Sequence, residues 1–240
     1  MTPLNEQELT DRAERSEVIE EVVHQLKTPL AMLRMHWEEE INNPELPQEI
    51  KIKVARSVEV IARLSHLINN LSLLHRSDHP HSPFAFTPLH LDELITDIVD
   101  DMGILADEKF QELQIVDLAE IMITGDRERL YQLFFNLIDN AIKYTPEYGH
   151  IDIALSRRYK WATVEIRDTG DGIPAHEIQP IFRRFYRGAD HRNRHVSGSG
   201  LGLPICKMIA EAHEGRIEVE SEVGVGSTFR VSLPLSDDAC

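Results

Sequence analysis

Glycine is distributed very unevenly along this chain of 240 residues. All twelve glycines lie after residue 100, whereas residues 5–76 contain no glycine and only three prolines. Because glycine and proline are the residues that most weaken helices, the first third of the chain favours long helices. Two of the three prolines, Pro44 and Pro47, fall in one short segment, so we expect two helices joined by a turn.

The second of these helices carries a heptad seam. Its seam positions alternate steps of four and three and are aliphatic except for one serine: Ile50, Val54, Ser57, Ile61, Leu64, Ile68 and Leu71. The first helix keeps the same rhythm between Ile19 and Trp37. A two-helix hairpin cannot cover so wide an apolar stripe, so we expect a homodimer in which two hairpins form a four-helix bundle.

A polar stretch with two prolines, residues 75–83, separates this hairpin from the rest of the chain. We therefore divide the chain into residues 1–80 and residues 81–240. The second part mixes helical and strand patterns, and we expect helices at 91–110, 127–143 and 204–214. Strands are expected at 113–118, 121–124, 151–156, 162–167, 217–220 and 228–233. These patterns predict an α+β protein of two domains, the second an α/β sandwich with one mixed sheet covered by helices on one face.

Composition narrows the function classes. The formal net charge of −16 argues against a nucleic-acid partner or binding to an anionic membrane. The two cysteines, Cys206 and Cys240, cannot form a disulfide framework, which is typical of a reducing compartment. The sequence has neither an apolar run long enough for a membrane span nor the pattern of a signal peptide. We expect a cytoplasmic chain without membrane contact of its own.

Four segments carry candidate chemistry, and each also has a plain structural interpretation. His24 follows the seam residue Val23, so its ring should be exposed on the flank of the bundle, as many surface histidines are. The Asn136–Thr145 segment places amides and a lysine on one face of a helix, which could equally be a solvated face. Asp168–Pro174 follows a strand as a glycine turn, and Gly198–Leu203 precedes a helix whose N-terminus can bind an anion.

In order and spacing, these segments resemble the cytoplasmic kinase core of bacterial two-component sensor histidine kinases. His24–Leu30 resembles the H box, Asn136–Thr145 the N box, and Asp168–Pro174 the G1 box. Ile181–Arg187 resembles the F box and Ser197–Leu203 the G2 box. Glu222–Phe229 is similar to the last glycine motif of the family. The resemblance covers roughly residues 15 to 235.

The resemblance implies a dimerization and histidine-phosphotransfer hairpin followed by a Bergerat-type ATP-binding domain. It implies that ATP phosphorylates His24 and that the phosphoryl group then passes to an aspartate of a response regulator receiver domain. Asn140, with Asn136 beside it, would hold Mg²⁺, and Asp168 would accept a hydrogen bond from the adenine amine. The remaining implied nucleotide-binding residues are Lys143, Tyr144, Gly170, Gly172, Ile173, Arg184, Ser199, Gly200, Leu201, Gly202 and Leu203. Residues 188–196 would form a mobile lid over ATP, and the parent protein could be an inner-membrane sensor.

Two positions near His24 bear on its chemistry. The family usually has an acidic residue directly after the histidine, and this chain has Gln25, whose carboxamide can orient an imidazole but cannot take its proton. Thr28 matches the position that orients water in members with phosphatase activity. The alternative function is therefore a catalytically weak scaffold that binds ATP, and an ATPase clamp or serine kinase on the same fold is a third.

Two weaker signals remain. Three histidines between residues 75 and 81 could ligate a metal, but they lack nearby cysteines and a clear fourth ligand. Cys206 lies just inside a predicted helix, where the N-terminus could lower the pKa of its thiol, although a buried packing role is the simpler expectation.

Overall fold

A computed structural model describes residues 23, 25–33, 35–41, 46–76, 84–188 and 199–236. The chain divides into two compact units, Met1–Ser82 and Pro83–Cys240.

The first unit is helical throughout its described residues apart from the turn before α2. Residues 25–33 and 35–41 are helical, and helix α2 spans Gln48–Arg76. The carbonyl of Pro47 accepts hydrogen bonds from the N–H groups of Ile50 and Lys51, so α2 starts directly after the second turn proline. The two predicted helices are thus confirmed for the described part of the hairpin.

Apolar side chains of this unit are only partly covered within one chain. Val23, Val54 and Ile61 are buried. Other seam residues of the two helices nevertheless remain between 40% and 46% exposed: Leu26, Leu33, Ile50 and Leu64. An isolated hairpin therefore leaves part of its apolar stripe exposed to water.

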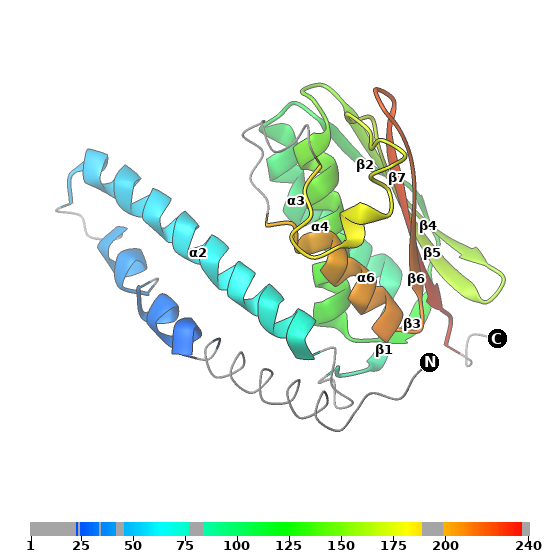
Figure 1. Ribbon diagram of the computed structural model, residues 1–240, viewed down its shortest axis with the longest axis horizontal. Coiled ribbons are helices and arrows are strands. Elements are labelled where there is room, and N and C mark those ends of the chain that lie inside the picture. Colours follow the sequence, from blue (N-terminus) through cyan, green and yellow to red (C-terminus); the bar gives the residue numbers. More distant parts are fainter. Residues whose placement is uncertain are drawn as a thin grey trace. The chain divides into compact units, whose positions relative to one another are not determined.

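The second unit is built on a five-stranded mixed sheet with the order β2-β4-β5-β7-β6 (Figure 1). Its strands are β2 (Glu112–Leu118), β4 (His150–Arg158), β5 (Trp161–Asp168), β6 (Arg216–Glu222) and β7 (Gly226–Pro234). Strands β2 and β4 run parallel, and all other neighbours are antiparallel. This arrangement confirms the predicted mixed sheet.

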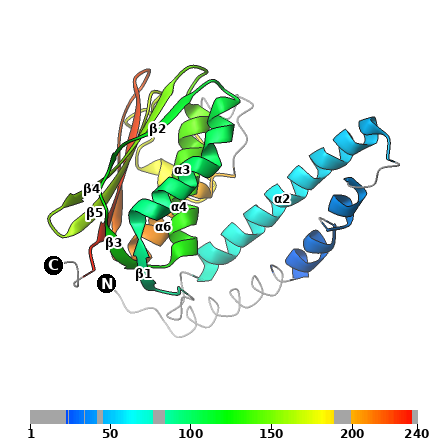
Figure 2. The ribbon, with the colours of Figure 1, turned by 180° about the vertical axis from the view of Figure 1, so that it is seen from behind.

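Within the described residues of this unit, three helices cover one face of the sheet, as the views from both sides show (Figures 1 and 2). They are α3 (Leu91–Asp107), α4 (Arg127–Tyr144) and α6 (Gly202–Ala212). Alternate strand residues such as Ile153, Val164 and Val231 are fully buried beneath them. The core therefore lies between the helices and the sheet, and the predicted α+β sandwich is confirmed.

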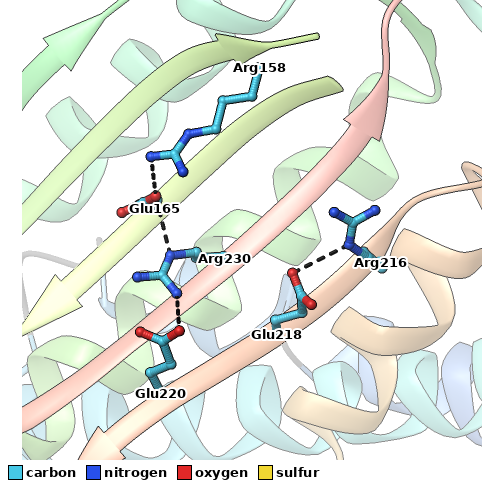
Figure 3. A network of polar contacts seen from close by, with 6 residues as sticks. All are labelled: Arg158, Glu165, Arg216, Glu218, Glu220 and Arg230. Atoms are coloured by element: carbon cyan, nitrogen blue, oxygen red, sulfur yellow. Dashed lines mark hydrogen bonds and ion pairs between the residues drawn. The ribbon is translucent and has the colours of Figure 1, made fainter. Parts of the chain in front are cut away.

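The opposite face of the sheet is polar and carries a chain of ion pairs across neighbouring strands (Figure 3). Glu165 Oε1 contacts Arg158 Nη2 at 3.1 Å and Arg230 Nε at 3.2 Å. Arg230 Nη1 in turn contacts Glu220 Oε1 at 2.6 Å. The outer groups, Arg158 and Glu220, are exposed, whereas Glu165 and Arg230 between them are 24% and 28% exposed. Exposed ion pairs contribute little to stability, so the central Glu165–Arg230 pair is the one with more weight.

The sequence patterns missed one strand and shifted several helix ends, both of those of α6 among them. Strand β1 (Thr87–His90) pairs with β3 (Met122–Gly125) in a separate antiparallel sheet, whereas the segment containing β3 was expected in the single mixed sheet. A four-residue strand that contains Pro88 has no recognisable alternation, which is why it was missed. Helix α6 begins at Gly202, before Pro204, and α3 ends at Asp107, three residues earlier than predicted.

A buried cluster ties the beginning of this unit to two of its helices. Asp126 caps α4, since its Oδ1 accepts from Arg129 N at 3.1 Å, and its Oδ2 accepts from Ala85 N at 2.9 Å. The backbone N–H of Asp126 donates to His213 Nε2 at 2.9 Å, and His213 Nδ1 lies 2.8 Å from the carbonyl oxygen of Ile209. The ring of His213 is therefore neutral, with its proton on Nδ1.

Candidate functional site

The predicted N box lies on the C-terminal half of α4. Asn136 is 7% exposed, and none of the described residues accepts a regular hydrogen bond from its Nδ2, although the side chain lies beside the Cys206 thiol. Gly202 faces it, because a Cβ added to Gly202 would lie 3.9 Å from Asn136 Cγ. A buried, unpartnered amide beside the start of a helix is a feature of binding sites, since it costs free energy unless a ligand satisfies it.

One turn further along α4, the side chains become more exposed. Asn140 and Lys143 are both half-buried. Lys143 Nζ forms an ion pair and hydrogen bond with Asp139, one turn earlier on the same helix. The family resemblance predicts that Lys143 contacts phosphate, and this ion pair was not predicted, although a spacing of four residues is typical of helix ion pairs.

Asp168 occupies the end of β5, in the middle of the sheet. It is 7% exposed, and its Oδ1 accepts hydrogen bonds from Gly170 N at 2.8 Å and Ser227 N at 3.2 Å. Burial raises the pKa of the Asp168 carboxyl, and these two backbone bonds oppose the rise. A buried carboxylate whose pKa is raised is a candidate binding-site residue.

The glycines of the G1 segment bring backbone close to backbone. A Cβ at Gly170 would lie 2.7 Å from both Asp168 Oδ1 and the carbonyl oxygen of Tyr144. Asp171 N also donates to that carbonyl oxygen at 3.2 Å. The loop after β5 therefore packs directly against the end of α4, and it joins Asp168 to the predicted N box.

The predicted F and G2 segments are joined in a similar way. Phe185 N donates to the carbonyl oxygen of Gly200 at 2.9 Å. Gly200 has a φ of +69°, and a Cβ there would lie 2.8 Å from the carbonyl oxygen of Tyr186. Ser199 Oγ accepts from Leu201 N at 3.3 Å, directly before α6 begins. Only glycine fits at position 200 without strain.

Charged and aromatic groups from the same segments lie around α4's end. Burial raises the pKa of the Tyr144 hydroxyl, and the positive charge of Arg187 opposes that rise. Arg184 is exposed in a turn within the F segment. Gly172 and Ile173 continue the G1 loop, and the backbone N–H of Ile173 donates to Ser221 Oγ at 2.7 Å. Ser221 was not singled out from the sequence.

The other predicted residues lie in different environments or outside the described part of the chain. His24 and the lid residues 189–196 lie outside the described residues, whereas Gln25 and Thr28 are exposed on the first helix. Leu201 is buried, and Leu203 is half-buried at the start of α6. Cys206 is fully buried and donates to the carbonyl oxygen of Leu133 at 3.4 Å, while burial raises the pKa of its thiol. The idea of a reactive Cys206 thiol is therefore wrong, and the packing role is confirmed.

The described residues contain neither a cluster of metal-ligating side chains nor a membrane-spanning helix. No three or more His, Cys, Asp or Glu side chains in these residues come together in a group that could hold a metal ion. Among the helices that the structure describes, none is apolar over a length sufficient to cross a bilayer.

Comparison with known proteins agrees with this geometry. Residues 125–237 match the family described as "Histidine kinase-, DNA gyrase B-, and HSP90-like ATPase". Sensor histidine kinase RppB of Synechocystis is 35% identical over 88% of this chain and 47% of its own length. Signal transduction histidine-protein kinase BaeS of Escherichia coli is 34% identical over 93% of this chain and 48% of its own length. The chain thus spans about half the length of these relatives.

Solved structures lead to the same family. The full-length structure of ShkA in complex with AMPPNP superposes with a TM-score of 0.75 and 25% identity, over 93% of this chain and 47% of that one. The mycobacterial sensor histidine kinase MprB superposes with a TM-score of 0.55 and 26% identity, over 63% of this chain and 98% of that one. The chain is therefore a relative of the cytoplasmic core of bacterial two-component histidine kinases, with an ATP-binding domain of the matched family at residues 125–237.

Proposed function

We propose that this chain is the kinase core of a sensor protein, which autophosphorylates His24 with ATP and passes the phosphoryl group to an aspartate of a response regulator receiver domain. The observation that carries the proposal is the convergence of four segments around α4. The loop that follows Asp168 contacts the end of α4, and Gly202 faces Asn136. The backbone N–H of Phe185 is hydrogen-bonded to the carbonyl oxygen of Gly200. The histidine kinase names of the relatives point in the same direction.

In this proposal, Asp168 accepts a hydrogen bond from the exocyclic amine of adenine, since its Oδ1 is already oriented by two backbone N–H groups. Tyr144, half-buried beside that loop, packs near the adenine ring. The backbone of the G1 loop at Gly170, Gly172 and Ile173 closes on the base. Because burial disfavours the carboxylate, a hydrogen bond from a donor on the base stabilises it.

The phosphates would lie over the segment that runs from Ser199 into α6. The N–H groups at the start of α6, from Gly202 and Leu203, remain without partners inside the helix and favour an anion. Lys143 and Arg184 supply positive charge toward the same region. The unpartnered Asn136 amide lies beside the first residue of α6, as a group that contacts the ligand should.

Mg²⁺ is the proposed companion of ATP. Such an ion keeps several waters and binds phosphate oxygens, so it needs few protein ligands. The amide oxygen of Asn140 would be the principal one, with Asn136 beside it. The bound ion would neutralise the charge that develops on the transferred group.

The hairpin is proposed to dimerise through its partly exposed seam. Leu26, Leu33, Ile50 and Leu64 are each at least 40% exposed within one chain, and a second hairpin can cover them. His24 on the flank would present a neutral imidazole nitrogen to the γ-phosphorus, Gln25 would orient the ring, and Thr28 would place water for a phosphatase reaction. We place the chain in the cytoplasm, as the inner part of a membrane sensor.

Labelling with γ-labelled Mg·ATP tests this function. Wild-type protein should take up label, and Asn140→Asp should take up none while its dimer remains intact. Gln132→Glu adds a comparable charge two turns earlier on α4 and should label like wild type. Full labelling of Asn140→Asp would remove the metal assignment. ATP binding without any label in wild-type protein would favour the scaffold alternative, and no ATP binding at all would refute the proposal.

A further inference from the structure

Three polar side chains form a row on the helix-covered side of the sheet, at the ends of three neighbouring strands. Ser221 of β6 is opposite Ser227 of β7, and Ser227 is opposite Asp168 of β5. The preceding row on the same side is entirely apolar and consists of Val219, Phe229 and Ile166. Polar residues thus replace the core pattern only where the sheet reaches the G1 loop.

The hydrogen bonds of Ser221 can be assigned completely. Its Oγ accepts from Ile173 N at 2.7 Å, and it lies 2.9 Å from both the carbonyl oxygen of Gly226 and Ser227 Oγ. A hydroxyl has one proton and two lone pairs. Because the carbonyl of Gly226 can only accept, Ser221 donates to Gly226, and the hydroxyl of Ser227 donates to Ser221. Every hydrogen-bonding position of the Ser221 hydroxyl is used.

These bonds join two backbone segments that already touch. A Cβ at Gly172 would lie 2.1 Å from the carbonyl oxygen of Glu222, and one at Gly226 would lie 2.0 Å from that of Asp168. Gly224 N also donates to the carbonyl oxygen of Asp171 at 2.8 Å. The G1 loop therefore packs directly against the turn between β6 and β7.

We propose that Ser221 is a positioning residue for the adenine nucleotide. It acts through the Ile173 N–H and through Ser227, whose own N–H holds Asp168 Oδ1 at 3.2 Å. A loop fixed in this way presents the carboxylate of Asp168 in one orientation before the base arrives. Binding of the adenine amine then avoids the entropic cost of ordering the Asp168 carboxylate. This inference rests on the proposed function, because it assumes that Asp168 binds the amine of adenine.

The test compares two nucleotides that differ at the group Asp168 would recognise. ADP carries the exocyclic amine, and inosine diphosphate carries an oxygen in its place. Affinities of the 240-residue chain for both nucleotides are measured by titration calorimetry, together with thermal unfolding. The variants are Ser221→Ala, Ser221→Thr, which keeps the hydroxyl, and Ser232→Ala, which removes a buried serine from the opposite face of β7.

Ser221→Ala should bind ADP about tenfold more weakly, the size of one to two net hydrogen bonds, while its affinity for inosine diphosphate stays close to that of wild type. Ser221→Thr should restore the preference for ADP, and Ser232→Ala should leave both affinities unchanged. An unchanged ADP affinity in Ser221→Ala would overturn the inference, as would an equal loss for both nucleotides. Failure of wild-type protein to bind ADP would instead overturn the proposed function and this inference with it.

Discussion

Gly172 offers a sharp test of the contact between the G1 loop and the β6–β7 turn. Gly172 has a φ of +72°, and a Cβ there would lie 2.1 Å from the carbonyl oxygen of Glu222, a backbone atom. Gly224 has a similar φ of +80°, but a Cβ there would meet nothing within 4 Å. Alanine at either position therefore has the same conformational strain, and only Gly172→Ala adds a steric clash.

The expected losses of stability follow from the backbone strain and from the steric clash. The left-handed conformation costs a non-glycine residue about 1–2 kcal/mol, so Gly224→Ala should lose about that much stability. Overpacking against backbone adds about 1–3 kcal/mol, so Gly172→Ala should lose about 2–5 kcal/mol in all. Gly103→Ala lies inside α3 with open space around it and should gain about 0.5–1 kcal/mol.

Urea unfolding of the full chain measures these differences. The chain has two tryptophans, and a Trp37→Phe background leaves Trp161 of β5 as the reporter for the second unit. Each glycine variant is compared with this background, and ADP affinity is measured on the same samples. If Gly172→Ala and Gly224→Ala unfold within about 0.5 kcal/mol of each other, the G1 loop does not rest on the β6–β7 turn and the reasoning fails.

Three further predictions concern other parts of the chain. Gln25→Glu should accelerate labelling of His24 by at most about 10²-fold, because a carboxylate can remove the second proton of the imidazole ring. Single-turnover experiments at saturating Mg·ATP measure this rate, and ATP affinity should not change. An unchanged or slower rate would contradict the prediction. Ile61→Asp should dissociate the dimer, as measured by light scattering, since an unpaired buried charge costs on the order of 3 kcal/mol or more. Ile52→Asp, at a residue that is 49% exposed, should leave the dimer intact. A monomeric wild-type protein at micromolar concentration would refute the four-helix bundle. Burial lowers the pKa of His213 below 6.5, so the folded chain binds fewer protons there than the unfolded chain, and its stability should fall as pH drops through 6.5. The stability of His213→Gln should depend less on pH over that window, and identical pH profiles would contradict the assignment.

Much of the second unit was accessible from the sequence because its strands and helices have regular apolar periods. Alternation in β4, β5 and β7 and the helical period of α4 predicted these elements to within a few residues. Glycine spacing located the G1 and G2 segments, because only glycine permits the close approaches found at Gly170 and Gly200. The site was therefore visible as separate segments.

The contacts that join those segments could not be foreseen in the same way. Lys143 forms an ion pair with Asp139 only if that contact is more favourable than hydration of the two side chains, and this balance depends on how far the surrounding residues bury them. Ser221 lies 53 residues from Asp168 in the sequence. The two residues come close only because the strand order β5-β7-β6 leaves a single strand, β7, between them. Strand order depends on how the whole chain packs, which local patterns do not encode.

The stability of the label to acid and base tests the central claim most directly. Phosphohistidine is lost in acid and survives base, because its phosphorus–nitrogen bond breaks once the ring is protonated, whereas phosphoserine and phosphothreonine survive acid. After incubation with γ-labelled Mg·ATP, the wild-type chain should carry label that is acid-labile and base-stable, and His24→Gln should carry none. Acid-stable label, or label that persists in His24→Gln, would contradict the account.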